Sequence, residues 1–454
     1  MKKNTSPWLH QLDKNRVAEK LHKDIETDIA IVGAGIAGVS SAFFILKNTK
    51  KSVVLLERFR LAHGATGHNA GQVVSYFERG FASLVEEFGA NLARQGQKDV
   101  EDAWKLLDEM YTDAGLDISF SRFIGHAGIV TYEQLLWHLK NNFERERAGL
   151  NTEHILVSET AGFIEKIPTH YRNLYSTTTL KNIQSMLETD EEKFIATVSY
   201  QKGCVNSALF CQEILLYLLT EYQDRFSFYE HTPVHKIILR QEDAVLDAEK
   251  HTVAAKRVVL CTNGFESLHI LNETGLDIDA KYHHLLSGKI GYMSGYLEKM
   301  NKPPTAVSYL TDPTIMPTIS YFYLTRRPYE YEKNSAHNLI SVGGPDVNLE
   351  EKTPYSHEDD YPDEMGETID QFVRSIYDTE PNKKIDYIFT WHGLMGYTKN
   401  RVRFIGQEPK NHVLLYNLGC NGIGILPSIH GGKKIADVIE GKKVGKSIFD
   451  VPAR

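Results

Sequence analysis

Three glycines in the spacing GxGxxG constrain this chain more than any other feature of its sequence. Gly33, Gly35 and Gly38 directly follow an apolar run, residues 29–32, that contains no turn residue. Such a run is typical of a strand buried on both faces of a parallel sheet. The uncharged stretch that follows, residues 39–46, is expected to continue as a helix. The order predicts a strand, turn and helix unit of an α/β fold.

A second apolar run, residues 52–56, ends in Glu57, about twenty residues after the last glycine. Unpaired N–H groups at a helix N-terminus stabilise a pyrophosphate when no side chain blocks its approach. Gly33 permits the tight turn, Gly35 lets the backbone approach the phosphates, and Gly38 lets the helix lie close to the strand. Glu57 stands where a carboxylate accepts hydrogen bonds from ribose hydroxyls, so the stretch predicts dinucleotide binding.

Two other interpretations of this stretch compete with nucleotide binding. Residues 29–46 carry no charge and are about long enough to be taken for a membrane helix. The glycines near one end, and the flanking Asp28 and Lys47, argue against that reading. A glycine turn between a strand and a helix can also be purely structural, and only the surrounding strands and acid favour a nucleotide.

Composition limits the class of protein. A chain of 454 residues can bury a large core and is expected to form two domains. Lys plus Arg number 51 and Asp plus Glu 59, a net charge of −8, which gives no reason to expect nucleic acid as a partner. The four cysteines are scattered, so neither a metal site nor a disulfide framework is predicted. The N-terminal residues lack the apolar segment of a signal peptide, and we expect a cytoplasmic protein without an integral membrane segment.

Periodicity along the chain predicts its remaining elements. Apolar residues at intervals of three and four indicate helices over residues 83–114, 133–147 and 205–222, the last capped by Asn206 or Ser207. Residues 1–24 form a polar arm with Trp8 as an apolar anchor, and residues 155–166 are expected to be helix or loop.

The second half of the chain changes character. Short strands within residues 226–260 lead into the small turn Thr262-Asn263-Gly264. From residue 282 onward, segments rich in Tyr, Ile and Thr predict an antiparallel sheet, interrupted by an acidic and then helical segment, residues 354–376. A glycine loop and a helix, residues 428–439, close the chain.

Four separated motifs together resemble one family of flavoproteins. They are DIAIVGAGIAG with VVLLE, the loop GATGHNAGQ, the mid-chain VVLCTNG, and the terminal LYNLGCNGIGILPSIHGGKKIADVI. The chain is similar in these pieces to the family of D-amino-acid oxidase, glycine oxidase, sarcosine oxidase and gamma-glutamylputrescine oxidoreductase. The resemblance implies FAD and a Rossmann-like FAD-binding domain, which we assign to residues 25–110, 203–270 and 390–454. It also implies a discontinuous antiparallel-sheet substrate domain, assigned to residues 111–202 and 271–389.

The resemblance carries a set of FAD contacts onto this sequence. They comprise the pyrophosphate turn and ribose acid, the loop beside the pyrophosphate and flavin ring, an adenine contact, the mid-chain turn and the loop at the pyrimidine edge of the flavin. These residues are Gly33, Gly35, Ile36, Ala37, Gly38, Glu57, Arg58, Ala65, Thr66, His68, Asn69, Ala70, Gly71, Gln72, Val234, Thr262, Asn263, Gly264, Gly422, Ile423 and Gly424.

Departures from the family pattern bear on how FAD is held and reoxidised. Some sarcosine oxidases attach the flavin through a cysteine where Met395 stands here, so that linkage is excluded. Dimethylglycine-type dehydrogenases use a histidine that His68 matches, which leaves a covalent link open beside the expected non-covalent binding. The strand that carries an oxygen-assisting lysine in sarcosine oxidases has none here, which puts oxygen as the electron acceptor in doubt.

The implied activity is oxidation of a C–N bond in an amine or amino acid, by hydride transfer to flavin N5, followed by hydrolysis of the imine. Arg326 is expected to clamp a substrate carboxylate, with Tyr323, Lys289 and His392 positioning the substrate. Arg327, Arg401 and Arg403 are alternatives for the clamp. A dehydrogenase that passes electrons to a quinone or carrier protein, and a non-catalytic FAD-binding protein, are the alternatives for the whole chain. We expect a monomer or homodimer.

Overall fold

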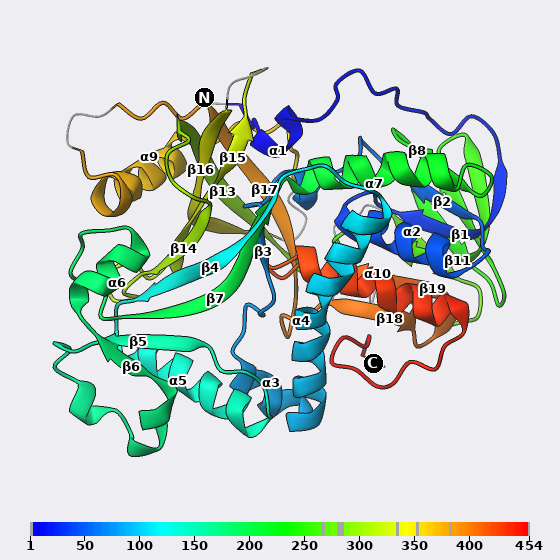
Figure 1. Cartoon of the computed structure of the whole chain (residues 1–454). Coiled ribbons are helices and arrows are strands. Elements are labelled where there is room, and N and C mark those ends of the chain that lie inside the picture. The colour runs from blue at the N-terminus through cyan, green and yellow to red at the C-terminus, as the bar shows by residue number, and fades with distance from the viewer. Residues whose placement is uncertain are drawn as a thin grey trace.

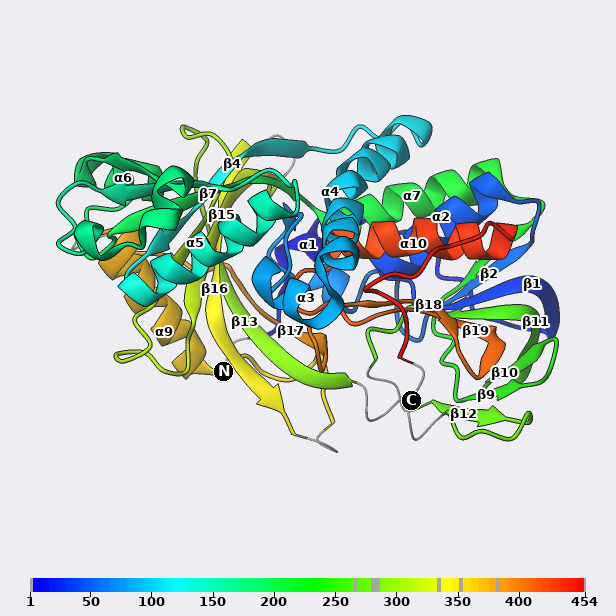
Figure 2. The same ribbon diagram turned by 90° about the horizontal axis from the view of Figure 1, so that it is seen from below.

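The structure is a computed structural model that describes residues 3–264, 268–278, 286–332, 336–350, 354–380 and 384–452. Two mixed sheets lie beside each other, the first of nine strands and the second of ten, with helices packed around them (Figures 1 and 2). The expected α/β fold class is therefore confirmed. Both sheets are assembled from segments far apart in the sequence, and the division into domains at the residues given above stays a prediction.

The first sheet has a parallel centre and an antiparallel side. Its central strands β8, β2, β1, β11 and β19 run parallel, as the apolar pattern predicts. The strand β11 pairs with β19 through its second half and with the antiparallel β10 through its first half. The strands are β1 (Ile25–Val32), β2 (Val53–Leu56), β8 (Phe226–Tyr229), β9 (Lys236–Leu239), β10 (Ala244–Ala248), β11 (His251–Leu260), β12 (His269–Asn272), β18 (Phe404–Glu408) and β19 (Asn411–Leu418).

The second sheet is mainly antiparallel, in the order β17-β13-β16-β15-β14-β4-β7-β5-β6, with β3 paired to β7. The long strands from the second half of the chain pair antiparallel, as expected, while β14 with β4 and β5 with β6 are parallel. The strands are β3 (Gln72–Val74), β4 (Phe120–Ile129), β5 (His154–Ser158), β6 (Ser176–Thr178), β7 (Ala196–Val205), β13 (Leu286–Lys299), β14 (Thr305–Leu310), β15 (Tyr321–Glu330), β16 (Ala336–Leu349) and β17 (Phe389–Thr398).

Helices cover the first sheet on one face, where α2, α7 and α10 form a layer (Figure 2). Alternate residues of β1 separate the two buried faces: Ile29 and Ile31 pack toward these helices, while Ala30 and Val32 pack on the opposite side. The sheet is thus buried on both faces. The described helices are α1 (Pro7–His10), α2 (Ile36–Asn48), α3 (Phe81–Phe88), α4 (Ala90–Asp113), α5 (Tyr132–Arg147), α6 (Leu180–Leu187), α7 (Ser207–Glu221), α9 (Asp363–Phe372) and α10 (Ile425–Glu440).

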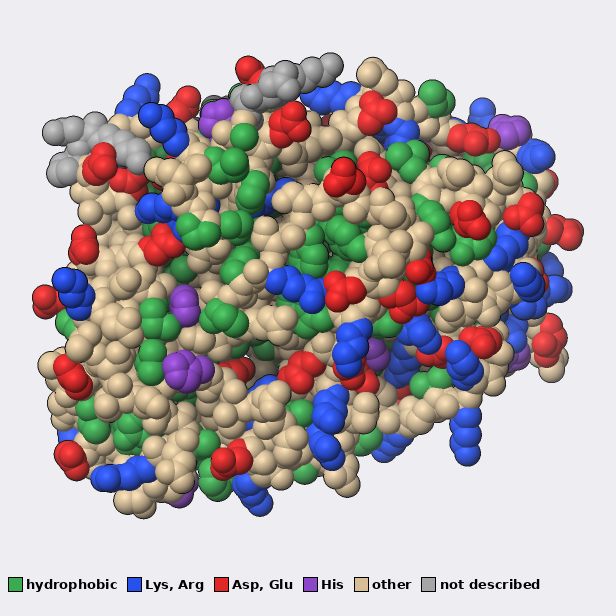
Figure 3. All heavy atoms as spheres, viewed as in Figure 1, with side chains coloured by type: hydrophobic (Ala, Val, Ile, Leu, Met, Phe, Trp, Pro, Cys, Tyr) green, Lys and Arg blue, Asp and Glu red, His purple; other side chains and the backbone are tan. Residues whose placement is uncertain are grey.

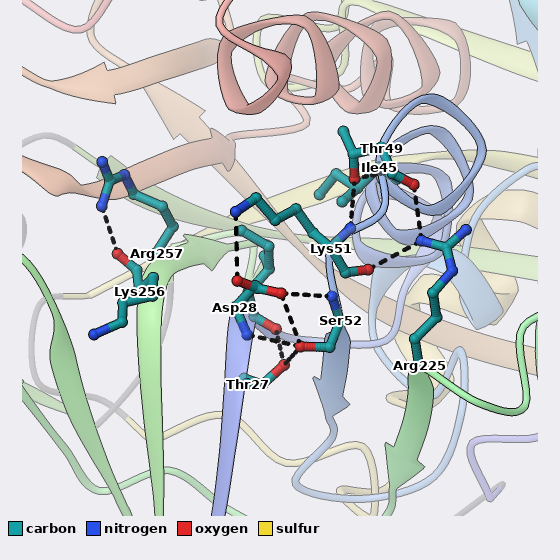
Figure 4. A network of polar contacts seen from close by, with 10 residues as sticks. Thr27, Asp28, Ile45, Thr49, Lys51, Ser52, Arg225, Lys256 and Arg257 are labelled. Carbon is teal, nitrogen blue, oxygen red and sulfur yellow. Dashed lines mark hydrogen bonds and ion pairs between the residues drawn. The ribbon is translucent and has the colours of Figure 1, made fainter.

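A polar network fixes the connection from α2 into β2 at the edge away from the glycine turn (Figure 4). The guanidinium of Arg225 donates to the carbonyls of Leu46, Thr49 and Lys51, at 2.6, 2.8 and 3.0 Å, and so satisfies carbonyls at the end of the helix. The Asp28 carboxylate accepts from the Ser52 amide at 2.9 Å. Although burial opposes the charged form, this amide and Lys51 hold the pKa of Asp28 below its usual value.

The N-terminal arm packs onto the body, as the isolated apolar residues predict. Trp8, in α1, is fully buried and meets Trp391 of β17 edge to face, with ring centroids 6.3 Å apart. Its indole nitrogen donates to the carbonyl of Asn69 at 2.5 Å. The arm therefore holds the loop that follows β2, a contact between residues about sixty positions apart that periodicity does not reveal.

Two sequence expectations need correction. The predicted helix over residues 83–114 is two helices, α3 and α4, because Gly89 between them has a φ of +78°. Residues 155–166, expected to be helix or loop, begin as β5, since Ile155 and Val157 alternate into a core against β7. The start of the antiparallel sheet placed at residue 282 lies outside the described residues, and β13 begins at Leu286.

Within the described ranges, no helix combines the length and the apolar character that a membrane crossing requires. The apolar stretch of residues 29–46 is divided between β1 and α2, so it is not one helix. On the face shown in Figure 3, acidic and basic side chains are interspersed among polar and apolar ones.

The contact between α2 and α10 gives a test of this packing. A Cβ at Gly432 would lie 2.7 Å from the Ser40 carbonyl carbon and 2.8 Å from the Ser41 amide nitrogen. We therefore expect Gly432→Ala to lower the free energy of unfolding by about 1–3 kcal/mol, because the helices must move apart. Urea denaturation measures the change. Gly445→Ala is the control, since a Cβ there meets nothing within 4 Å. Equal stability of the two variants would contradict the packing.

Candidate functional site

A cavity of about 400 Å³ lies where the carboxyl ends of the parallel strands of the first sheet meet the second sheet. Ligands of open α/β sheets bind at this edge. The ends of β1, β2 and β11, the loop after β2, the loop before α10, and side chains of β13, β15, β16 and β17 all line the cavity. The cavity thus extends from the glycine turn to the antiparallel strands.

The glycine turn leaves no room for side chains. A Cβ at Gly33, where φ is +101°, would lie 2.7 Å from the Cys261 carbonyl oxygen, and one at Gly38 would lie 1.9 Å from the Gly33 oxygen. Gly35 is the N-cap of α2 and has no side chain to cap the helix, and the first turn of α2 contains no acidic residue. Apart from the Ile36 amide, which the Thr66 hydroxyl accepts from, the N-terminal partial positive charge of α2 faces the cavity, which suits a pyrophosphate.

Glu57 follows β2 and is held by the backbone of the same site. Its carboxylate accepts from the amides of Ala34 at 2.8 Å and Phe59 at 2.9 Å. Burial raises its pKa, against the effect of these two amides. The remaining acceptor capacity of a carboxylate with two oxygens is available to the hydroxyls of a ribose.

The loop after β2 is fixed from several sides. The Thr66 hydroxyl accepts from the Ile36 amide at 3.0 Å, so the loop meets the first turn of α2. The Asn69 side chain donates to the Ser207 hydroxyl at 2.8 Å. A Cβ at Gly71, where φ is +67°, would lie 2.6 Å from the Trp8 ring. Arm, loop and helix are therefore packed as one unit along the cavity.

His68 is a buried, neutral imidazole in this loop. Its Nδ1 lies 3.0 Å from the Gly64 carbonyl, which can only accept, so Nδ1 carries the proton and Nε2 does not. Its ring stacks on His357 with centroids 4.4 Å apart and planes at 12°. Burial lowers the pKa of His68 to about 4. Burial also lowers the pKa of His357, to about 2, and the neighbouring His68 ring contributes to that shift.

A second helix N-terminus faces the cavity at α10, whose N-cap Gly424 has no capping side chain and whose first turn contains no acidic residue. Asn263, in the turn after β11, accepts from the Cys420 amide at 3.0 Å and donates to the Leu394 carbonyl at 3.1 Å. Arg403 donates to the Asn417 side chain at 2.6 Å and to its carbonyl at 2.8 Å. These bonds position the glycine loop. The guanidinium of Arg403 is already bonded to Asn417, so its position is explained without a contact to substrate.

Tyrosines and charged groups form the wall on the second sheet. Tyr321 donates to the Glu78 carboxylate at 2.9 Å, and a Cβ at Gly422 would lie 3.1 Å from the same carboxylate oxygen. Burial raises the pKa of Glu78, against the effect of the Tyr321 hydroxyl. Lys289 is paired with Asp346 at 3.0 Å. In this wall Lys289 and Asp346 neutralise each other, and among the described residues the Glu78 carboxylate has no ion-pair partner.

Most of the cofactor residues carried over from the family line this cavity. They are Gly33, Gly35, Ile36, Ala37, Glu57, Arg58, Ala65, Thr66, His68, Asn69, Ala70, Gly71, Gln72, Val234, Thr262, Asn263, Gly422, Ile423 and Gly424. Gly38 and Gly264 are not among its lining residues and pack against the Gly33 carbonyl and the Leu286 side chain instead. Of the substrate residues, Tyr323 and Lys289 line the cavity, as do Arg401 and Arg403.

Arg326 lies away from the cavity and is not available as a clamp. It is only 1% exposed, and it holds both oxygens of Glu188 at 2.6 and 2.7 Å. The pairing raises its pKa despite burial. The reason is strand alternation, since Tyr321 and Tyr323 face the cavity and a residue three further along β15 faces the other way. Arg327 is likewise not part of the lining and stacks on Trp8 at 5.1 Å.

His392 is also outside the lining of the cavity. Its Nε2 donates to the Asp359 carbonyl at 2.9 Å, so its Nδ1 accepts from the Tyr355 hydroxyl, also at 2.9 Å. On β17 the cavity is lined by Gly393, Met395 and Tyr397. Side chains alternate between the two faces of a strand, so the sequence spacing alone places His392 on the opposite face from Gly393, Met395 and Tyr397.

Glu78 and Tyr76 line the cavity and were not identified from the sequence. They lie on the segment between β3 and α3, where no periodic pattern marks one side chain as facing inward. Their placement depends on the packing of α3 and α5 against the second sheet.

Fold and cavity define a dinucleotide-binding protein of the Rossmann type, with a second sheet over the open side of the site. The family model described as FAD dependent oxidoreductase matches residues 28–438. The chain therefore belongs to the FAD-dependent oxidoreductase family, which confirms the resemblance drawn from the motifs, and the family implies FAD as the cofactor.

Individual relatives are distant. The chain is 36% identical to gamma-glutamylputrescine oxidoreductase of Escherichia coli over 76 residues, which is 17% of this chain and 18% of that protein. It is 20% identical to the probable oxidoreductase OrdL of Haemophilus influenzae over 93% of this chain and 85% of that one. The solved structure of glycine oxidase from Geobacillus kaustophilus matches with a TM-score of 0.67 at 17% identity, over 94% of this chain and 99% of the other. L-proline dehydrogenase from P. horikoshii matches with a TM-score of 0.64 at 15% identity, over 94% and 95%.

Glu57 gives a direct test of nucleotide binding. We expect Glu57→Gln to raise the Kd for FAD by roughly 10- to 100-fold, because an amide cannot accept from both ribose and backbone as a carboxylate does. Titration of the FAD-free protein, followed by flavin fluorescence, measures the Kd. Glu26→Gln, at the exposed opposite end of β1, is the control for loss of a charge. An unchanged Kd in Glu57→Gln would place the ribose elsewhere.

Proposed function

We propose that this protein oxidises the C–N bond of an amine or amino acid with FAD held in the cavity described above. The observation that carries the proposal is the continuity of the cavity, from the glycine turn and Glu57 at one end to Glu78 and the tyrosines at the other. FAD, when bound, accepts a hydride equivalent, and the resulting imine hydrolyses in water. The names of the relatives, glycine oxidase and L-proline dehydrogenase among them, support a small amino compound as substrate.

In this proposal the residues of the chain position the substrate and manage its proton. An amine must lose its ammonium proton before the C–N bond is oxidised. The Glu78 carboxylate, with one oxygen bonded to the Tyr321 hydroxyl, is the acceptor that lines the cavity beside Gly422. Tyr323 and the strands of the second sheet exclude water from this end. If the substrate carries a carboxylate, Arg401, which has no ion pair among the described residues, is its partner in place of Arg326.

The first test is anaerobic reduction of the bound flavin. We expect at least one compound in a panel of amino acids, N-methyl amino acids, amines and polyamine conjugates to bleach the flavin absorbance. We expect Glu78→Gln to slow the bleaching or raise the apparent Kd by roughly 10- to 100-fold, because it removes the proton acceptor. Burial raises the pKa of Glu78, so the rate in the wild type falls as the pH drops through a value above the ordinary carboxyl range.

Glu86→Gln is the matched control, because Glu86 pairs with Lys140 on the surface. A flavin that no compound in the panel bleaches would contradict the proposed function and favour a protein that binds FAD without catalysis. Bleaching that is equally fast in Glu78→Gln and Glu86→Gln would assign the proton to another group.

We further propose that FAD is held non-covalently. The Gly64 carbonyl and the His357 ring engage one nitrogen and one face of His68, which supports a packing role for this side chain. Acid precipitation of the purified protein is therefore expected to release the yellow colour into the supernatant. Colour that stays in the pellet, and is absent from the pellet of His68→Ala, would establish a bond from Nε2, the unprotonated atom of the ring.

A further inference from the structure

A second cavity of about 170 Å³ adjoins the first on the side of α3 and α5. Tyr76, Glu78, Ser308 and Tyr321 line both cavities, so the two share a wall at the substrate end of the site. We call the second cavity the side chamber. It opens toward solvent beside Trp137, whose side chain is 50% exposed.

Aromatic rings make up much of the side chamber. Tyr76 and Tyr200 meet with their ring centroids 4.9 Å apart, and Phe81 and Trp137 line the chamber with them. A Cβ at Gly80 would lie 2.9 Å from the Trp137 ring, so the ring is packed closely at the entrance. Faces of Tyr and Trp rings attract alkylammonium groups and accept their methylene chains.

One carboxylate in the side chamber has no partner. The backbone of Glu153 is fixed by Asn142, which accepts from its amide at 2.9 Å and donates to its carbonyl at 2.7 Å. Its side chain lines the chamber and makes no hydrogen bond or ion pair with any residue that the structure describes. Glu153 is half-buried, and a poorly solvated carboxylate without a partner is stabilised when a cation reaches it.

The two arginines that line the chamber, Arg79 and Arg145, form their hydrogen bonds and ion pairs with groups other than Glu153. Arg145 donates to Glu101 at 2.8 Å and to the Asn151 carbonyl at 2.8 Å. Arg79 donates to Glu87 at 2.6 Å and to the Asn400 carbonyl at 2.7 Å. Neither arginine therefore neutralises Glu153 by direct contact.

Burial also shifts the pKa values of the titratable groups around the side chamber. Burial raises the pKa of Glu153 to about 7, and Arg145 opposes this while Glu101 adds to it. Burial lowers the pKa of His138 to about 4, so that ring is neutral. Lys202, behind Ser308 at 3.4 Å, has its pKa lowered by burial to about 8, with the charge of Glu78 acting against this.

We propose that the side chamber binds a second, positively charged nitrogen of the substrate, so that the amine oxidised beside Glu78 belongs to a molecule with a distal alkylammonium group. The inference rests on the proposed function and narrows its substrate class. The reacting end lies in the main cavity, the methylene chain passes Tyr76 and Tyr321, and the distal ammonium meets Glu153 and the aromatic rings.

The experiment compares matched amines on the FAD-loaded enzyme. Linear α,ω-diamines of three to eight carbons and the monoamines of equal length are tested by anaerobic flavin reduction, and the apparent Kd is taken from saturation of the rate. We expect diamines to bind about 10- to 100-fold more tightly than monoamines, with an optimum at one chain length. Glu153→Gln is expected to remove most of this preference, while Glu146→Gln, exposed at the end of α5, retains it.

The pH dependence adds a readout that a structural role would not give. The tighter binding of diamines over monoamines is expected to be greatest above about pH 7. It is expected to weaken at lower pH, because Glu153 becomes protonated while the distal amine stays charged. The charged and titratable groups that interact with Glu153 are Arg145, Glu101, which is paired with Arg145, and Tyr76 and Tyr200, whose pKa values burial raises above the ordinary tyrosine value. If Glu153→Gln does not fold, Trp137→Ala at the entrance is expected to lower the preference instead.

The outcomes separate the two proposals. If no amine of either series, and no compound of the earlier panel, reduces the flavin, the proposed function fails. If amines reduce the flavin but diamines and monoamines bind equally, or the preference survives in both Glu153→Gln and Trp137→Ala, the side chamber is not a cation subsite. A preference for compounds with a distal carboxylate would also overturn the inference and assign the chamber to Lys202.

Discussion

The close approach of three backbones at Gly33 is the constraint on which the rest of the site depends. The carbonyl of Gly33 lies where a Cβ of Gly38 would be, and Gly33 itself fits beneath the carbonyl of Cys261. Any side chain at either glycine separates α2 from β1 or β1 from β11. Because these elements stay in contact, the N-terminus of α2, Glu57 and the turn at Asn263 converge on one edge of the sheet. This convergence presents the backbone N–H groups at the start of α2 to a pyrophosphate.

Features set by local pattern were accessible from the sequence. The parallel strands are continuous apolar runs, the glycine turns mark where backbones approach, and Asn206 caps α7 with two hydrogen bonds. Contacts that join distant segments were not accessible. The hydrogen bond from Trp8 to the Asn69 carbonyl and the inward position of Glu78 follow from packing between distant elements. No periodic pattern in the sequence predicts either of them. The expectation of helix or loop for residues 155–166 was wrong at its start. Ile155 and Val157 alternate into the core, and the segment pairs with β7 as the strand β5.

The substrate residues are a different case, because the alternation of side chains along a strand decides which of them reach the cavity. On β15 it places Tyr321 and Tyr323 toward the cavity and Arg326 away from it, and on β17 it separates Met395 from His392. Arg326, which was expected to clamp a substrate carboxylate, therefore lies on the face of β15 that points away from the cavity. Its role is structural: with Glu188 it forms a bidentate ion pair on the other side of the sheet. Successive side chains of a strand point to opposite faces of the sheet, so a residue can contact the substrate only if it lies on the face toward the cavity.

Burial gives the site opposite polarities at its two ends. At the nucleotide end, the N-termini of α2 and α10, which have no acidic residue in their first turns, present partial positive charge, and His68 and His357 stay neutral because burial disfavours their charged forms. At the other end, Glu78 and Glu153 remain in a poorly solvated wall without direct basic partners, which raises the pKa of both. Low dielectric strengthens both effects, because a charge that enters meets little competing solvent. The two ends of the cavity therefore differ in electrostatic character as well as in shape.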